Sequence, residues 1–237
     1  MAKLKICYLN VFENHLFPLT TLLNERDESL EIYQTKIGSV GSWCWESAIC
    51  LAEYCYDHMF NQFQNKRIVE IGSGTGVVGL QVCALGGRVI LTDREEYLEL
   101  LNYNIQKNIH ALTGTARAKT LFWGDDLPAD DDDFRNVDYV IVANCVYHSI
   151  ELEHLIQTIC NLCPENCSTC LLCCYELRND GIRVLVNEFH QKLMEKSFLI
   201  ESIPSTDFRL KYQNDYNAIF KCRRMNLDSR LNGVKSI

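Results

Sequence analysis

Apolar residues follow two different spacings along this chain, and the change from one to the other marks the predicted elements. Short runs rich in branched apolar residues predict buried strands, and segments with apolar residues three or four positions apart predict helices. The predicted strands are 67–71, 88–92, 117–122, 138–143 and 169–175, and the predicted helices are 45–60, 76–85, 95–108, 149–162 and 181–196. This alternation indicates a mainly parallel sheet packed against helices.

The two ends of the chain depart from this alternation. Two final strands, at 198–203 and 216–223, have no long helix between them, so we expect an antiparallel hairpin at the sheet edge. Strands at 3–12 and 30–37 predict a small antiparallel unit, with the polar stretch 24–29 as its turn. We therefore predict an α/β fold with a seven-stranded, Rossmann-like, mostly parallel sheet. Its parts are an N-terminal β appendage at 1–40, the sheet domain at 41–225 and a polar C-terminal tail at 226–237.

Charge and cysteine content narrow the class of protein. The chain has 237 residues and a formal net charge of -8, which argues against a nucleic-acid partner because nucleic acids bind basic surfaces. No apolar run has the length of a membrane span, and the first residues lack the apolar core of a signal peptide. The thirteen cysteines are then expected to be free thiols in a reducing compartment. We expect a monomeric, cytoplasmic protein that binds no membrane.

Six of the cysteines crowd together at spacings that resemble a zinc site. They are Cys160, Cys163, Cys167, Cys170, Cys173 and Cys174. Cys173 and Cys174 are consecutive in a predicted strand, so their thiols should point to opposite faces and cannot both reach one metal ion. We therefore favour small buried side chains over a zinc site and expect no metal.

A run of alternating glycines follows the first strand of the predicted sheet. The segment Glu70-Ile-Gly72-Ser73-Gly74-Thr-Gly76 reads as a strand end, a turn and a helix start, and Asp93 stands at the tip of the next strand. Such glycines let the backbone approach a ligand closely, and a carboxylate there can accept hydrogen bonds from both hydroxyls of a ribose. The pattern predicts a nucleoside-binding crevice, because an ordinary turn would not require three alternating glycines.

Two details favour S-adenosylmethionine over a dinucleotide as the ligand of this crevice. The third glycine of the dinucleotide fingerprint would fall on Val77. Glu70, at the mouth of the turn, would repel a pyrophosphate but would suit a ligand with a cationic end. S-adenosylmethionine has a ribose, no phosphate, an ammonium and a sulfonium. The predicted cofactor is therefore S-adenosylmethionine, and the predicted sheet domain is a methyltransferase.

The residues that follow the other strands should meet at the same edge of the sheet. Trp123 can cover an adenine ring, although it could also be a core tryptophan, and Ala143 leaves room beneath the nucleoside. Asn144 and Tyr147 form an Asn-x-x-Tyr loop, in which the amide can orient a substrate amine and the ring can wall its channel. Alternatively, Asn144 caps the following helix. Tyr175 ends the fifth strand.

Two further features have plain explanations beside their functional ones. His148 could act as a base, but a lone histidine beside a turn is more often a passive surface residue. The acidic loop after Trp123 contains Asp126 and residues 130–133. It is either a solvated connection, which we favour, or a surface that recruits a basic substrate.

Taken together, these motifs resemble the seven-stranded family 16 of protein-lysine methyltransferases. The resemblance rests on Glu70-x-Gly-x-Gly-x-Gly76, Thr92-Asp93, Trp123-Gly124, Asn144-x-x-Tyr147 and the upstream Trp45-Glu-Ser-Ala-Ile segment, and it covers roughly residues 40–180. It implies that Trp45, Gly72, Gly74, Asp93, Trp123 and Ala143 contact the cofactor, that Asn144, Tyr147 and Tyr175 face the lysine, and that Glu176 supports the pocket. The family usually has an acidic residue where this chain has Asn144, so the resemblance leaves its catalytic strength open.

Within that family, Ala118-Lys-x-Leu-x-Trp-Gly124 and Cys173-Cys-Tyr-Glu-x-Arg178 are similar to the member that methylates valosin-containing protein, an AAA+ ATPase. The resemblance implies transfer of a methyl group from S-adenosylmethionine to a lysine of a protein substrate, either that ATPase or another protein such as a translation factor or a chaperone. Two different functions remain open beside this one. The first is methylation of nucleic-acid amino groups by enzymes that use an Asn-Pro-Pro-Tyr loop. In this chain Cys145 and Val146 stand in place of the two prolines, which argues against that function. The second is binding of the cofactor without catalysis.

Overall fold

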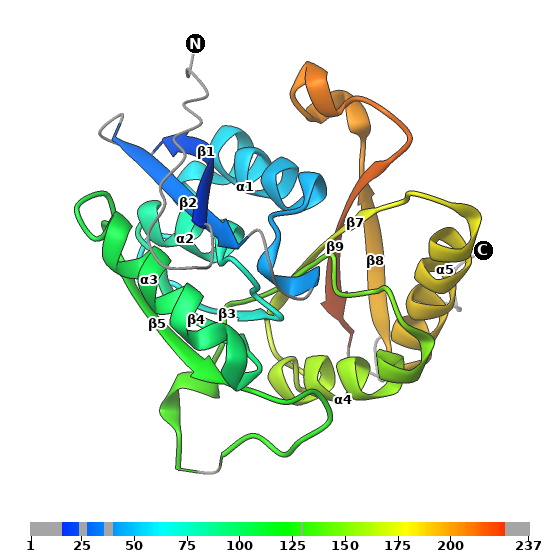
Figure 1. The fold of residues 1–237 in the computed structure, drawn as a ribbon. Helices are drawn as coiled ribbons and strands as arrows, with labels where there is room; N and C mark the ends of the chain where they lie inside the picture. The colour runs from blue at the N-terminus through cyan, green and yellow to red at the C-terminus, as the bar shows by residue number, and fades with distance from the viewer. Residues whose placement is uncertain (1–15, 24–27, 36–39, 129, 226–237) are drawn as a thin grey trace.

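The structure is a computed structural model that describes residues 16–23, 28–35, 40–128 and 130–225. A seven-stranded sheet forms its centre, with the strand order β5-β4-β3-β6-β7-β9-β8 (Figure 1). Its strands are β3 (Arg67–Ile71), β4 (Arg88–Asp93), β5 (Thr115–Thr120), β6 (Tyr139–Ala143), β7 (Cys170–Glu176), β8 (Phe198–Ile203) and β9 (Asn217–Arg224). Strands β3 to β7 pair in parallel, and β9 pairs antiparallel with both β7 and β8. The predicted mostly parallel sheet with an antiparallel hairpin at its edge is confirmed.

Five α-helices in the described part of the chain cover the two faces of the sheet (Figure 1). They are α1 (Glu46–Met59), α2 (Val77–Ala84), α3 (Leu98–Asn108), α4 (Leu152–Leu162) and α5 (Asp180–Glu195). Helices α1, α2 and α3 pack into one apolar core, and α4 and α5 pack into a second core across the sheet. All five lie within two residues of a predicted helix or inside one. No helix of the described residues is long and apolar enough to cross a membrane.

The strand β5 begins two residues earlier than predicted and ends at Thr120. Leu121 and Phe122 continue the apolar pattern, which led the prediction to 122, but they leave the sheet. Leu121 donates its backbone N–H to the carbonyl of Asp93, 3.0 Å away, and both residues line the cavity described below. The apolar pattern therefore continues beyond the end of β5 because Leu121 and Phe122 form part of the cavity wall.

A separate two-stranded sheet lies beside α3. It pairs β1 (Leu16–Leu23) with β2 (Ser29–Thr35) in antiparallel register. The strand β2 was predicted, but β1 was not, and the predicted strand at 3–12 lies outside the described residues, as does the C-terminal tail at 226–237. The buried amide of Asn104 on α3 bonds to both the N–H and the carbonyl of Tyr33, at 2.9 Å each. These amide contacts attach the small sheet to the main domain.

Candidate cofactor and substrate site

One large cavity opens at the carboxyl ends of β3, β4 and β6, beside the start of α1. Its volume is about 780 Å³, within the range of small-molecule sites. Ten of the twelve residues predicted for the site line it: Trp45, Glu70, Gly72, Ser73, Gly74, Asp93, Trp123, Ala143, Asn144 and Tyr147. The fold thus brings together side chains from several segments of the chain, as expected for strand ends of a doubly wound sheet.

The glycine turn forms a close-fitting wall of this cavity. Gly72 and Gly74 have φ angles of 62° and 55°, which favour glycine. A Cβ atom on Gly72 would lie 2.7 Å from the sulfur of Cys145 and 3.0 Å from Cζ2 of Trp123. A Cβ atom on Gly74 would lie 2.5 Å from the carbonyl oxygen of Gly41. Glycine is therefore required at both positions by backbone conformation and by close packing, and both residues line the cavity.

Asp93 holds the glycine turn and faces the cavity. Its Oδ2 accepts the backbone N–H of Gly74 at 2.7 Å, and its Oδ1 accepts its neighbour Arg94 N–H at 2.8 Å. Burial raises the pKa of Asp93, and these two hydrogen bonds oppose that rise. Each carboxylate oxygen keeps a further lone pair for a ligand hydroxyl. Both oxygens are thereby oriented before a ribose arrives.

The protonation of the Glu70 carboxyl differs from the ionised form that the sequence suggested. Its carboxyl is buried, and Oε2 accepts the N–H of Gly79 in the first turn of α2 at 3.0 Å. Burial raises its pKa to about 8, although the bond from Gly79 opposes this. The group is therefore mostly protonated at neutral pH, which weakens the argument that its charge repels a pyrophosphate. Its first role is to bind the start of α2 at the back of the cavity.

Asn144 has a backbone conformation that explains part of its identity. Its φ of 57° lies in the left-handed region, which asparagine tolerates better than most residues. Its Oδ1 accepts the backbone N–H of Glu176 at 3.1 Å, and its own N–H bonds to the carbonyl of Cys174 at 2.9 Å. It caps neither the short helical turn at Ser149–Glu151 nor α4. The amide therefore connects β6 to β7 and reaches the cavity from there.

Aromatic side chains surround the outer part of the cavity. Tyr147 is 46% exposed and Trp43 is 50% exposed, while Trp123 is half-buried against the apolar core. Trp123 thus serves both the core and the cavity. Burial raises the pKa of the Tyr147 phenol, so it stays neutral at physiological pH. Its ring lies 5.4 Å from that of His148, which also lines the cavity.

The expectation that Tyr175 faces the substrate is wrong. It is 1% exposed, and its ring packs edge-on against Phe189 and His190 of α5, at 6.1 and 5.6 Å between centroids. Alternation along β7 turns this side chain to the face opposite α1. Gly76 does not line the cavity either: it precedes α2 with φ of 77°, where a Cβ atom would crowd Leu101 at 3.0 Å. Its role is in helix packing.

Several residues that line the cavity were not predicted from the sequence. The guanidinium of Arg178 lies 4.3 Å from the centre of the Trp45 ring, within the range of a cation–π contact. Across the cavity, Arg94 donates to the hydroxyl of Tyr97 at 3.1 Å. Arg94 follows Asp93 directly, so its position could have been inferred. No sequence signal pairs Arg178 with a residue so distant in the chain.

The structure also shows the surroundings of the acidic loop and of the clustered cysteines. In the acidic loop, Asp131 and Asp133 form ion pairs with Lys119 of β5 at 2.5 and 2.6 Å, so part of its charge is neutralised locally. Cys173 and Cys174 do lie on opposite faces of the sheet, in different apolar cores. Among the described residues, no group of three or more His, Cys, Asp or Glu side chains could hold a metal ion.

Fold and cavity together define an S-adenosylmethionine-dependent methyltransferase. A solved structure with the same fold is the magnesium protoporphyrin IX methyltransferase of Synechocystis PCC 6803 with bound S-adenosylmethionine. The TM-score is 0.52 at 14% sequence identity, and the likeness covers 75% of this chain and 77% of that one. A profile described as "Lysine methyltransferase" matches residues 24–196. The chain therefore belongs to the lysine methyltransferase family.

The sequence relatives agree with this family. Protein-lysine methyltransferase METTL21E of Mus musculus is 34% identical over 191 residues, which is 78% of this chain and 73% of the relative. EEF1A lysine methyltransferase 3 of Xenopus tropicalis is 32% identical over 136 residues, which is 57% of this chain and 58% of the relative. The protein is thus a protein-lysine N-methyltransferase, and its cofactor is S-adenosylmethionine.

Proposed function

We propose that this methyltransferase modifies a lysine of valosin-containing protein, an AAA+ ATPase, in the cytoplasm and as a monomer. The proposal is supported by the positions of the two segments, 118–124 and 173–178, that resemble the methyltransferase of this ATPase. The segment 118–124 ends at Trp123 and Gly124 and the segment 173–178 ends at Arg178, and both Trp123 and Arg178 line the cavity. The resemblance therefore falls on two parts of the cavity wall, the part that would cover the adenine and the part beside Trp45.

The cofactor fits the residues at the inner end of the cavity. Asp93 would hold the ribose hydroxyls, Gly72 and Gly74 would allow the close approach of the nucleoside, and Trp123 would cover the adenine beside Ala143. When bound, S-adenosylmethionine supplies a methyl group activated by its sulfonium. Every other requirement of the reaction must be met by the protein side chains.

The outer part of the cavity suits a lysine side chain. An amine reacts only in its neutral form, and an aromatic channel of low polarity favours that form by penalising the charged one. The Oδ1 of Asn144 has a second lone pair that can orient the amine, and the ring of Tyr147 can wall its path. Because a neutral amide cannot take up a proton, we assign Asn144 to orientation and expect the amine to lose its proton before it reaches this residue. Alignment of the reacting atoms would then supply much of the acceleration.

A second candidate substrate is a translation elongation factor. The relative from Xenopus tropicalis is named as an EEF1A lysine methyltransferase, and it is 32% identical to this chain. Because a fold does not select a target, the two substrates must be compared directly.

The test is methyl transfer from radiolabelled S-adenosylmethionine to two purified proteins, valosin-containing protein and elongation factor 1A, and to a lysate from cells that lack the enzyme. We expect one labelled lysine in valosin-containing protein and no label with the Asp93→Ala variant. Label in the elongation factor alone would select the second candidate. Label only in another protein of the lysate would overturn both targets.

A further inference from the structure

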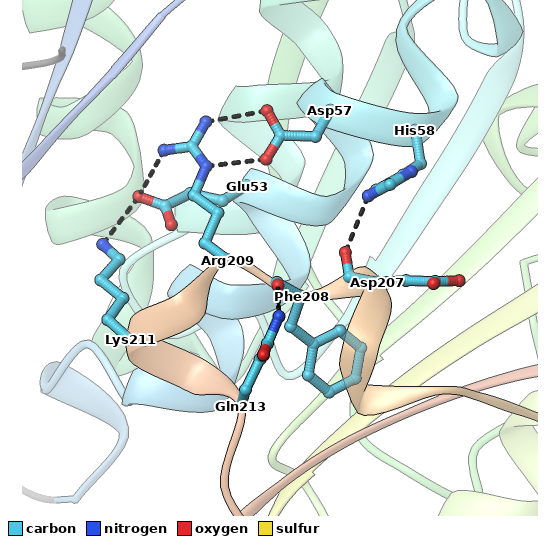
Figure 2. Close-up of polar contacts among 8 residues, drawn as sticks. All are labelled: Glu53, Asp57, His58, Asp207, Phe208, Arg209, Lys211 and Gln213. Carbon is cyan, nitrogen blue, oxygen red and sulfur yellow. Dashed lines mark hydrogen bonds and ion pairs between the residues drawn. The ribbon is translucent and has the colours of Figure 1, made fainter.

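The connection between β8 and β9, residues 204–216, is attached to α1 by a compact set of ion pairs (Figure 2). Arg209 donates from Nε and Nη2 to the two carboxylate oxygens of Asp57, at 2.7 and 2.9 Å. Its Nη1 lies 3.1 Å from Glu53, and Lys211 reaches the same Glu53 oxygen at 3.0 Å. The side chain of Glu53 is only 6% exposed. A buried carboxylate requires such cations, so this attachment is specific.

Other contacts extend the same attachment along the connection. His58 lies 2.7 Å from the carbonyl of Asp207, with Nε2 directed at it. Phe208 and Tyr212 are buried, and the ring of Phe208 meets Tyr54 of α1 edge-on at 6.4 Å. The connection is therefore fixed to the second half of α1 by charge and by apolar packing.

The end of the connection and Asn217, the first residue of β9, contact the two segments that carry Trp45 and Arg178. Asn217 donates from Nδ2 to Glu46, the first residue of α1, at 2.8 Å. The carbonyl of Tyr216 accepts the N–H of Leu177 at 2.6 Å, and the carbonyl of Asp215 accepts a bond from Arg183 at 2.8 Å. The same stretch of chain thus holds the start of α1 and the segment 177–183.

These two segments carry Trp45 and Arg178, which contact each other in the wall of the cavity. Trp45 directly precedes α1, and Arg178 follows β7, with the guanidinium 4.3 Å from the ring centre. The two points at which the connection holds α1, near Glu46 and near Asp57, are eleven residues apart, or roughly 16 Å along the helix. A segment attached to α1 at both points can set the orientation of this helix relative to the sheet, and with it the position of Trp45.

We propose that residues 204–217 act as a brace that holds the Trp45–Arg178 contact in the wall of the substrate mouth, with Arg209 and Asn217 as positioning residues for the incoming lysine segment. Neither residue lines the cavity. The proposal rests on the function proposed above, in which a lysine of a protein enters the outer part of the cavity, whose wall includes the contact between Trp45 and Arg178. It assigns to the connection a part in substrate fit, with no contact to the reacting atoms.

The first test needs no substrate. Amide hydrogen exchange is compared in the full-length protein and in Arg209→Gln, Arg209→Lys and Asn217→Ala, with Arg117→Gln as a matched control because its partner Asp133 lies on another part of the surface. We expect exchange in 177–183 to rise at least tenfold in Arg209→Gln and Asn217→Ala, and less in Arg209→Lys. Faster exchange confined to 204–213 and α1 would overturn the brace.

The second test measures methyl transfer to purified valosin-containing protein by the same variants. We expect KM for the protein to rise about fivefold in Arg209→Gln with kcat within twofold of the original enzyme, and Arg209→Lys to restore most of the loss. A larger fall in S-adenosylhomocysteine affinity than in apparent protein affinity would contradict a role at the mouth. If the original enzyme does not label this protein, the target proposal fails, and the exchange result still decides the brace.

Discussion

The inner and outer halves of the cavity are built in different ways. The inner half consists mainly of backbone and carboxylates from residues 70–93, close in sequence and mostly buried, as the bond from Gly74 to Asp93 illustrates, and Trp123 and Ala143 complete it. The outer half consists of exposed aromatic and cationic side chains whose supports are distant, such as the bond from Asn217 to Glu46 across 171 residues. Most of the cofactor half is thus encoded locally, whereas the substrate half depends on the complete fold.

The largest effect should come from Asp93→Ala in the inner half. The variant loses the two backbone bonds that hold the glycine turn and the predicted acceptors of the ribose hydroxyls. We expect affinity for S-adenosylhomocysteine to fall at least about 100-fold, or about 2.7 kcal/mol, since hydrogen bonds to charged groups are strong. Titration calorimetry measures this, with the exposed Asp125→Ala as control. Equal affinity in both variants would refute the site assignment.

The buried carboxyl of Glu70 gives the inner half a pH dependence. Its pKa is raised from 4.5 to about 8 in the folded protein, so the favourable protonated form is present at low pH and is lost as the pH rises. Glu70→Gln mimics the protonated form. We expect the difference in unfolding free energy between Glu70→Gln and the wild-type protein to increase, in favour of the variant, by on the order of 3 kcal/mol between pH 4.5 and 9. Urea unfolding across this range measures the difference, and a constant difference would show that the pKa of Glu70 does not change on folding.

Asn144 stands where the two halves meet, so its effect should be intermediate. Asn144→Ala removes the acceptor for Glu176 N–H and places alanine at a φ of 57°, which is strained. We expect kcat to fall about tenfold, consistent with about 1.4 kcal/mol, with cofactor affinity within twofold. Asn144→Asp keeps the acceptor and adds a carboxylate that can take up the proton of the amine, so its activity should match or exceed that of the wild-type enzyme. Should aspartate be as damaging as alanine, the orientation role would be untenable.

The smallest effect should come from Tyr147→Phe in the outer half. The ring that walls the predicted lysine channel is retained, and only the half-exposed hydroxyl is lost. We expect kcat to fall about two- to threefold with no change in cofactor affinity, which corresponds to less than about 0.7 kcal/mol. Steady-state kinetics beside Tyr147→Ala, which removes the ring, separates the two contributions. An equal loss in the two variants would assign the role to the hydroxyl.

Prediction from the sequence succeeded for features that depend on local pattern and failed for features that depend on tertiary contacts. The main strands, the glycine turn, Asp93 and the loop from Ala143 to Tyr147 were all placed at one edge of the sheet by local pattern. The error at Tyr175 arose because a strand end offers two faces, and only packing against α5 shows which face is used. The first strand of the small sheet was missed for a related reason, because its pairing with β2 is a tertiary contact.

The sequence by itself determined the elements and the cofactor edge, because apolar spacing and positive-φ glycines act over a few residues. Only the tertiary structure decided the protonation of Glu70, since its pKa depends on burial under α2. It also decided that Arg178 lies over Trp45 and that residues 204–217 hold both of their segments. The contacts with Trp45 and Glu46 join parts of the chain more than one hundred residues apart, and no local pattern records such a distance.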